Sequence, residues 1–213
     1  MLSVPGAKKR KRDGAATREK ILAEALVLFA EKGFDATSVK DISSAVGVAD
    51  AALYRHFPSK EELAHAVFKR HYSALAGQIA EIGNSHGAIG PIMDGLVELL
   101  CRTFDDEPNA FTFILINQHN HLRFVGLSDN PVEEVATIMR KAIANGEIAI
   151  DDPDLAAAIA LGVAIQPAIF HLYGRLHGKL ADIRHHITEA VYRALGIRSG
   201  QSLPGRHITP ESN

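Results

Sequence analysis

Residues 37–60 read Thr37-Ser-Val-Lys-Asp-Ile-Ser-Ser-Ala-Val-Gly-Val-Ala-Asp-Ala-Ala-Leu-Tyr-Arg-His-Phe-Pro-Ser-Lys60 and predict two short helices joined by a tight turn. Ser38 followed by Asp41 is a capping box, in which side chains and backbone satisfy each other's hydrogen bonds, so a helix begins there. Gly47 provides the permissive backbone that a sharp turn requires. One face of the first helix is apolar and is expected to be buried; it carries Val39, Ile42 and Val46.

The second helix follows the turn directly and spans about residues 50–57. Leu53 and Phe57 are spaced i and i+4 and form its inward pair. Pro58 disfavours helix at the residue before it, and Ser59 with Glu62 makes a second capping box that starts the next helix. The segment is therefore a helix-turn-helix whose second helix has a free outward face.

Residues 46–63, Val-Gly-Val-Ala-Asp-Ala-Ala-Leu-Tyr-Arg-His-Phe-Pro-Ser-Lys-Glu-Glu-Leu, resemble the core signature of the TetR-type (TetR/AcrR) family of bacterial transcriptional regulators. The resemblance continues upstream through Thr17-Arg-Glu-Lys-Ile-Leu, Leu28-Phe29 and Gly33-Phe34, and so covers about residues 15–75. It implies an all-α fold of about nine helices. A three-helix DNA-binding domain at 17–60 would precede a helical ligand-binding and dimerisation bundle at 61–196.

Charge is distributed unevenly along the 213 residues. Residues 1–60 hold eleven Lys and Arg against seven Asp and Glu, a balance of +4, whereas the remainder has a balance of −6. Basic charge releases counterions from phosphate, so the N-terminal part suits an anionic partner; ordinary scatter of surface charge is the simpler alternative. With 46% hydrophobic residues, the chain is expected to form a sizeable globular core.

The two ends of the chain differ in composition from the rest. Residues 1–16 contain Lys8-Lys-Arg-Lys-Arg12 and are expected to form a flexible basic arm, either a solvated tail or a segment that lies along DNA. Residues 197–213 are rich in Gly, Pro and Ser and are expected to be disordered. The longest apolar run, Leu155–Phe170, is shorter than the ~20 residues that span a bilayer, and no signal peptide is visible. A cytoplasmic protein without membrane contact is therefore expected.

Helical patterns fill the region between these ends. The first helix is expected to begin at Thr17 and to end at Gly33, with Phe34 packing back on Phe29. A fourth helix, from Glu61 to about Ile82, would link the helix-turn-helix to the second domain. Five further helices are expected at Pro91–Phe104, Asn109–His121, Pro131–Asn145, Pro153–Arg175 and Leu180–Leu195.

The N-terminal half of the second helix of the motif would enter a major groove. The resemblance implies that Tyr54 and Lys60 contact phosphates and that the backbone N–H groups at Ser38 face another phosphate. The expected DNA contacts are Ser38, Lys40, Ala49, Asp50, Ala51, Ala52, Tyr54, Arg55, His56 and Lys60.

Residues 49–52 depart from the commonest family pattern, which has Ser, Lys or Pro, Gly, and Thr or Ser at these positions. Alanine methyl groups can touch a thymine methyl but make no bidentate hydrogen bonds, so direct base readout is expected to be thin. Asp50 either accepts a hydrogen bond from cytosine or is simply favoured by the helix dipole. Arg55, Lys40 and the basic arm would then carry more of the affinity, and DNA shape more of the discrimination.

The helices from 91 to 176 mix apolar and polar side chains, as small-ligand pockets do. For each of the pocket residues named below, and for Phe113, the alternative is that the side chain belongs to the core of the helix bundle. The eleven histidines include no His-x-x-x-His pair and Cys101 is the single cysteine, so no metal, cofactor or intrachain disulfide is expected. The expected pocket residues are Phe104, Phe111, Ile114, Gln118, His121, Met139, Gln166, Phe170 and His171.

The last two helices are expected to form the interface of a two-fold homodimer. The first offers small residues that allow close helix approach, Ala156, Ala157, Ala158, Ala160, Gly162 and Ala164, and the second repeats apolar ones, Leu180, Ile183, Ile187, Val191 and Leu195. Such a dimer places two recognition helices about 34 Å apart and predicts a palindromic operator. Alternatively, these faces are buried within one subunit.

Together these inferences predict a transcriptional repressor that binds double-stranded DNA as a dimer and is released by an unknown small-molecule effector. One alternative is a DNA-binding protein of the same fold without an inducer, in a structural or division-control role or as an activator. A helical enzyme with a histidine-lined pocket is another, but no nucleophile lies at suitable spacing from a base, so no catalytic residue is assigned.

Overall fold

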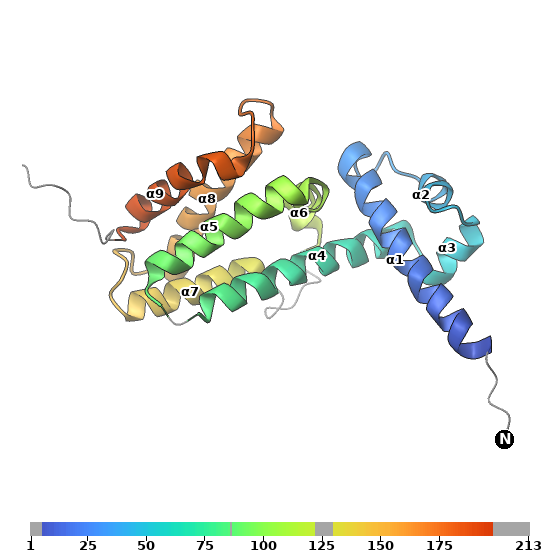
Figure 1. Cartoon of the computed structure of the whole chain (residues 1–213), viewed down its shortest axis with the longest axis horizontal. Coiled ribbons are helices and arrows are strands. Elements are labelled where there is room, and N and C mark those ends of the chain that lie inside the picture. Colours follow the sequence, from blue (N-terminus) through green and yellow to red (C-terminus); the bar gives the residue numbers. More distant parts are fainter. Residues whose placement is uncertain (1–5, 86, 122–129, 198–213) are drawn as a thin grey trace, which may run out of the picture. The chain divides into compact units, whose positions relative to one another are not determined.

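The computed structural model describes residues 6–85, 87–121 and 130–197, with the side chains of 6–13 and 116–121 excepted. These ranges contain nine α-helices, one 3-10 helix and no strand (Figure 1). In chain order they are α1 (Gly6–Lys32), α2 (Val39–Val46), α3 (Asp50–His56), α4 (Lys60–Gly83), α5 (Ile89–Asp106), α6 (Pro108–His121), α7 (Pro131–Ala144), α8 (Pro153–Leu172), the 3-10 helix η3 (Leu180–Ile183) and α9 (Arg184–Leu195). The all-α prediction is confirmed.

The chain divides into two compact units. The N-terminal unit comprises Met1–Glu81 and Arg102–Glu134, and the C-terminal unit comprises Ile82–Cys101 and Val135–Asn213. The first therefore holds α6 and most of α4 in addition to the helix-turn-helix. The assignment of 17–60 to DNA binding and of 61–196 to ligand binding and dimerisation is functional, and it stays a prediction.

Helices α1 to α4 and α6 build the core of the N-terminal unit. Phe113 of α6 stacks on Phe29 of α1, with ring centroids 5.6 Å apart, and only 1% of Phe113 is exposed. A helix from the middle of the chain thus completes the core behind α2 and α3. The buried members are Ile21, Leu22, Ala25, Phe29, Ile42, Val46, Leu53, Phe57, Leu63, Ala64, Val67, Phe68, Tyr72 and Phe113.

The helix-turn-helix has the boundaries that its sequence predicts. Of the inward residues, Ile42, Val46, Leu53 and Phe57 are buried, whereas Val39 is half-buried against the same core. Gly47 ends α2 in the left-handed region with φ of 78°. Proline follows directly after the C-cap of α3, Phe57. Local capping and turn signals therefore sufficed to place both helices.

The ends of α1 differ in how well they were predicted. At its C-terminus Gly33 has φ of 84°, and the ring of Phe34 lies 5.6 Å from that of Phe29, as expected. At its N-terminus the helix begins at Gly6, well before the expected start at Thr17. The expected start was wrong because Lys, Arg and Ala favour helix even where apolar periodicity is missing. The predicted arm thus overlaps α1, and residues 1–5 lie outside the described part.

In the C-terminal unit α8 and α9 pack against each other (Figure 1). Small residues of α8 are buried in this unit, Ala156, Ala157 and Ala160, and so are larger apolar ones that follow it, Leu180, Ile187, Val191 and Leu195. These residues were candidates for a dimer interface, and the alternative of burial within one subunit holds for them. Helix α8 ends at Leu172, earlier than expected, because Gly174 adopts φ of 68°.

A second face of α8 remains exposed. Leu155 is 52% exposed, Phe170 45% and Tyr173, the C-cap, 72%. With the exposed Ala158, Gly162 and Gln166 they recur every three or four residues and share one side of the helix, here called the exposed α8 face. Among the described helices α8 is also the one long and apolar enough to cross a membrane, a weak sign that many soluble helices share.

Candidate nucleic-acid interface

The capping box fixes the first turn of α2. The Ser38 hydroxyl oxygen accepts from the Asp41 N–H at 3.1 Å, while Asp41 Oδ2 accepts from the Ser38 N–H at 2.8 Å and from its hydroxyl at 2.6 Å. These hydrogen bonds, first of all the one from the Ser38 side chain, lower the pKa of Asp41. The start of α2 is therefore held in one geometry while Ser38 remains at the surface.

Helix α3 lacks a side-chain cap and is fixed to α2 instead. Its N-cap is Ala49, which makes no side-chain hydrogen bond. The next residue, Asp50, accepts a short hydrogen bond at Oδ1 from the hydroxyl of Ser43 on α2. Ser43 is only 2% exposed and was not predicted to matter, since no local signal marks a serine that pairs across a turn.

The predicted DNA contacts lie on α2, on α3 and at the start of α4. Most are exposed: Ser38, Lys40, Ala49, Asp50, Ala51, Tyr54 and Arg55; the half-buried ones are Ala52, His56 and Lys60. Tyr54, at 49% exposure, is the large aromatic on this surface. The outward face of α3 is therefore free to meet a partner, whereas its inward pair holds it to the core.

Lys60 has a structural role that the sequence did not reveal. Its ammonium donates to the carbonyl oxygens of Phe34 at 2.8 Å and Thr37 at 3.0 Å, and it lies 4.2 Å from the centroid of the Phe34 ring. Lys20 acts in a similar way on the end of α2, donating to the Val46 carbonyl oxygen at 2.8 Å. Because an ammonium has three protons, Lys60 keeps one for a phosphate.

The predicted pocket residues lie in both units. Phe104 and Phe111 form an edge-to-face pair with centroids 5.2 Å apart in the N-terminal unit, and Ile114 packs against its core. Met139 is fully buried in the C-terminal unit. His171 Nε2 lies 2.7 Å from the Gly178 carbonyl oxygen. Gln118 and His121 belong to α6, but their side chains fall outside the described part.

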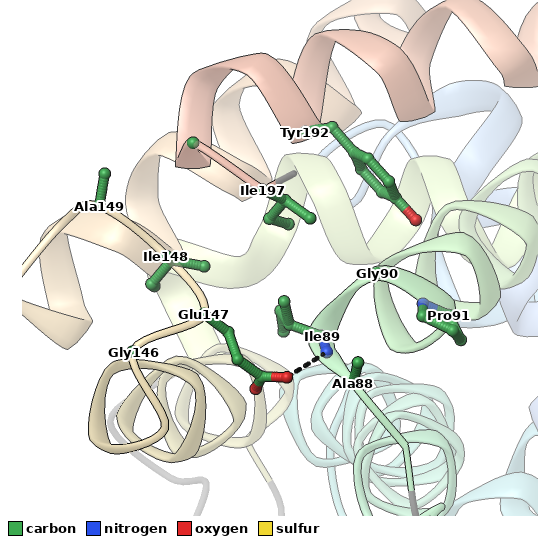
Figure 2. A pocket seen from close by; sticks show the side chains of 11 residues that line it. Ala88, Ile89, Gly90, Pro91, Gly146, Glu147, Ile148, Ala149, Tyr192 and Ile197 are labelled. Carbon is green, nitrogen blue, oxygen red and sulfur yellow. Dashed lines mark hydrogen bonds between the residues drawn. The ribbon is translucent and has the colours of Figure 1, made fainter. Parts of the chain in front are cut away.

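Figure 2 shows a hollow of about 630 Å³ in the C-terminal unit, lined by the start of α5, residues 146–149 and the end of α9. Glu147 Oε1 accepts from the Ile89 N–H at 3.2 Å, so a carboxylate already fills this helix N-terminus. Burial, with a 2.9 Å hydrogen bond to Asp94, raises the pKa of Tyr192 to about 12. None of the predicted pocket residues lines this hollow.

A second, largely apolar hollow of about 440 Å³ lies between α8 and α9. Gln166 and Phe170, both predicted for a ligand pocket, line it together with Ile183 and Ile187. Since Gln166 and Phe170 also belong to the exposed α8 face, this hollow opens on the surface that carries the exposed apolar side chains.

Comparison with known sequences matches the N-terminal region to one family. Residues 21–67 match the model for bacterial regulatory proteins of the tetR family. The transcriptional repressor KstR2 of Rhodococcus jostii is 40% identical over 116 residues, which are 53% of this chain and 56% of KstR2. The chain spans about half the length of the curated relatives it matches.

Solved structures agree in fold over most of the chain. A regulatory protein of the tetR family from Rhodococcus RHA1 superposes with a TM-score of 0.73 at 17% identity, covering 86% of this chain and 98% of that one. The regulator FadR of Bacillus subtilis, in complex with stearoyl-CoA, gives 0.67 at 18% identity over 81% and 96%. In its N-terminal motif the chain is therefore similar to the tetR family of bacterial regulatory proteins, and it shares its fold with solved structures of such regulators.

Proposed function

We propose that this protein is a transcriptional repressor that binds a palindromic operator as a homodimer and is released by a small-molecule effector. The observation that carries the proposal is the exposed face of α3, held by a buried inner face and flanked by basic residues. A rigid, exposed helix of this kind fits the major groove. The similarity to KstR2 supports repression rather than activation.

The proposed DNA contacts divide by chemistry. Lys40, Arg55, Lys60 and the backbone at Ser38 meet phosphates, and Tyr54 donates its hydroxyl to another phosphate. Residues 49–52 and His56 lie closest to the bases. Since the target is chromosomal DNA, the protein acts in the cytoplasm.

The exposed α8 face is the proposed dimer interface. It presents three large apolar side chains that are 45 to 72% exposed in the subunit, next to an apolar hollow. Exposed apolar surface of this extent marks an interaction site, and a second copy of the same helix offers a matching surface around the two-fold axis.

The proposed effector is a ligand with a long apolar chain. The support is the largely apolar hollow between α8 and α9 together with the FadR structure, whose ligand is stearoyl-CoA. An effector that favours one arrangement of the two α3 helices over another changes operator affinity by that difference in binding free energy. Long-chain acyl-CoA thioesters are therefore the first class to test.

The experiment is a fluorescence anisotropy titration of the protein on duplexes from the region flanking its own gene. Specific, salt-sensitive binding that is reversed by an acyl-CoA, and not by coenzyme A alone, is the expected result. Binding that no ligand reverses would favour the inducer-free alternative. Absence of binding to any duplex at low salt would overturn the proposal.

A further inference from the structure

The recognition helix α3 carries one acidic residue, Asp50, and the structure holds its carboxylate in place. The hydroxyl of the buried Ser43 lies within hydrogen-bond reach of Asp50 Oδ1 and of the Lys40 carbonyl oxygen, the latter at 3.1 Å. A hydroxyl has one proton, and the bond to a charged acceptor is the stronger. The proton of Ser43 therefore goes to Asp50.

The second oxygen of this carboxylate is available to a ligand. Asp50 is exposed, and its Oδ2 has no hydrogen-bond partner among the described residues. Asp50 is also the first residue of α3, and the N-terminal residues of a recognition helix are the ones that reach base edges. Ser43 thus holds one oxygen of the Asp50 carboxylate and leaves the other as an acceptor at the surface.

An ionised carboxylate only accepts hydrogen bonds. In the major groove the cytosine N4 amino group is a donor, whereas guanine and thymine show acceptors that repel a carboxylate. Adenine has the N6 donor but places the N7 acceptor beside it. The base that suits a single oriented carboxylate oxygen is therefore cytosine.

We propose that Ser43 positions Asp50 as a cytosine reader, so that this pair sets the preference at one base pair of each half-site. The inference rests on the proposed DNA-binding function and adds the residue pair that determines part of its specificity. Ser43 itself touches no base, because it is buried; it is a positioning residue.

The opposing interpretation is that the Ser43 to Asp50 bond only fastens α3 to α2. Asp50→Asn separates the two. The asparagine Oδ1 can still accept from Ser43, and the outward group is then an amide N–H donor instead of an acceptor. If Asp50 contacts the base, the Asp50→Asn variant should prefer a base with acceptors, guanine above all, in place of cytosine. If the bond only holds α3 against α2, the base preference of the variant should be that of the wild type.

The test measures binding preference at every position of the operator for four proteins: wild type, Asp50→Asn, Ser43→Ala and Ser44→Ala. The wild type should favour cytosine at one position per half-site by about ten-fold. Asp50→Asn should move that preference to guanine, and Ser43→Ala should flatten it while other positions keep theirs. Ser44, the exposed neighbour of Ser43 on α2, should behave as wild type.

Loss of stability alone weakens binding to all sequences equally, so the preference profile distinguishes reading from fastening. An unchanged profile in Asp50→Asn, or a uniform loss in Ser43→Ala, would overturn the inference. If the wild-type protein binds no duplex, the proposed function fails instead. If the wild-type protein binds an operator but shows no preference for cytosine, the role of Asp50 in base recognition is rejected and the proposed function stands.

Discussion

The ammonium of Lys60 lies 2.8 Å from the carbonyl oxygen of Phe34 and 4.2 Å from the centroid of that residue's ring. A hydrogen bond from a charged donor and a cation–π contact both depend on this one side chain. We expect Lys60→Met to lower the free energy of unfolding by about 2 kcal/mol, measured by urea titration.

Lys40→Met is the matched control for this change. Lys40 is exposed on α2, and its side chain makes no hydrogen bond, ion pair or ring contact within the described part of the chain, so its loss should leave stability unchanged. It should instead reduce the salt dependence of operator binding by about one phosphate contact. Equal stability of the two variants would contradict the structural role of Lys60.

Phe113→Ala tests whether α6 belongs to the core of the N-terminal unit. The ring is 1% exposed and stacks on Phe29, so its removal leaves a cavity behind the helix-turn-helix. We expect a loss of about 3 to 5 kcal/mol in the free energy of unfolding. Tyr54→Ala, which truncates an exposed aromatic, should cost little stability; a small effect at Phe113 as well would show that the core closes without α6.

His71 on α4 makes stability depend on pH. Burial is the main cause that lowers its pKa, Arg70 acts in the same direction, and Glu107 opposes both. Because the pKa of His71 in the folded protein lies below its ordinary value of 6.5, the unfolded chain binds the proton first as pH falls below 6.5. The stability that the neutral imidazole of His71 allows is therefore present above pH 6.5 and is lost as pH falls through the pKa of the folded state. Urea titrations at about pH 8 and about pH 5 should show a smaller loss in His71→Asn than in wild type. Identical losses would assign the acid sensitivity to other groups.

Gly162→Arg tests the exposed α8 face. A Cβ at Gly162 meets no described atom within 4 Å, so the subunit accommodates the substitution, and helix propensity improves. Two arginines brought together at a two-fold interface repel each other, so sedimentation should show a monomer with weakened operator binding. Gly77→Arg is the control, because Gly77 is an equally open helical position outside this face. If the Gly162→Arg variant is still a dimer, the dimer interface lies on a surface other than the exposed α8 face.

Much of the helix-turn-helix could be predicted from the sequence because its signals are local. The capping box at Ser38 and Asp41, the glycine at 47 and the inward spacing of Leu53 each act within a few residues, and each is found as expected. Contacts between distant residues leave no such trace. The bonds of Lys60 to the segment before α2 depend on how three helices meet, which periodicity does not encode.

The candidate site in the second half was harder to predict for a different reason. Helix α6 is apolar on several sides, so its sequence does not say which residue faces a cavity and which a core; Phe113 joins the core of the N-terminal unit. The alanines of α8 presented the same ambiguity between a neighbouring helix and a second copy. The composition of α6 and α8 shows that they have faces that pack, but which element packs against each face follows only from the fold.

The contribution of Phe113 to the N-terminal core limits how this protein can be rebuilt. Chimeric regulators are often made by joining the DNA-binding domain of one protein to the ligand-binding domain of another. The family match at residues 21–67 suggests a domain boundary shortly after residue 67. A fragment cut there would leave behind the aromatic ring that closes its interior. A chimera should therefore include α6 together with the helix-turn-helix, or the protein that provides the second domain should contribute an aromatic ring of equal size at the position of Phe113.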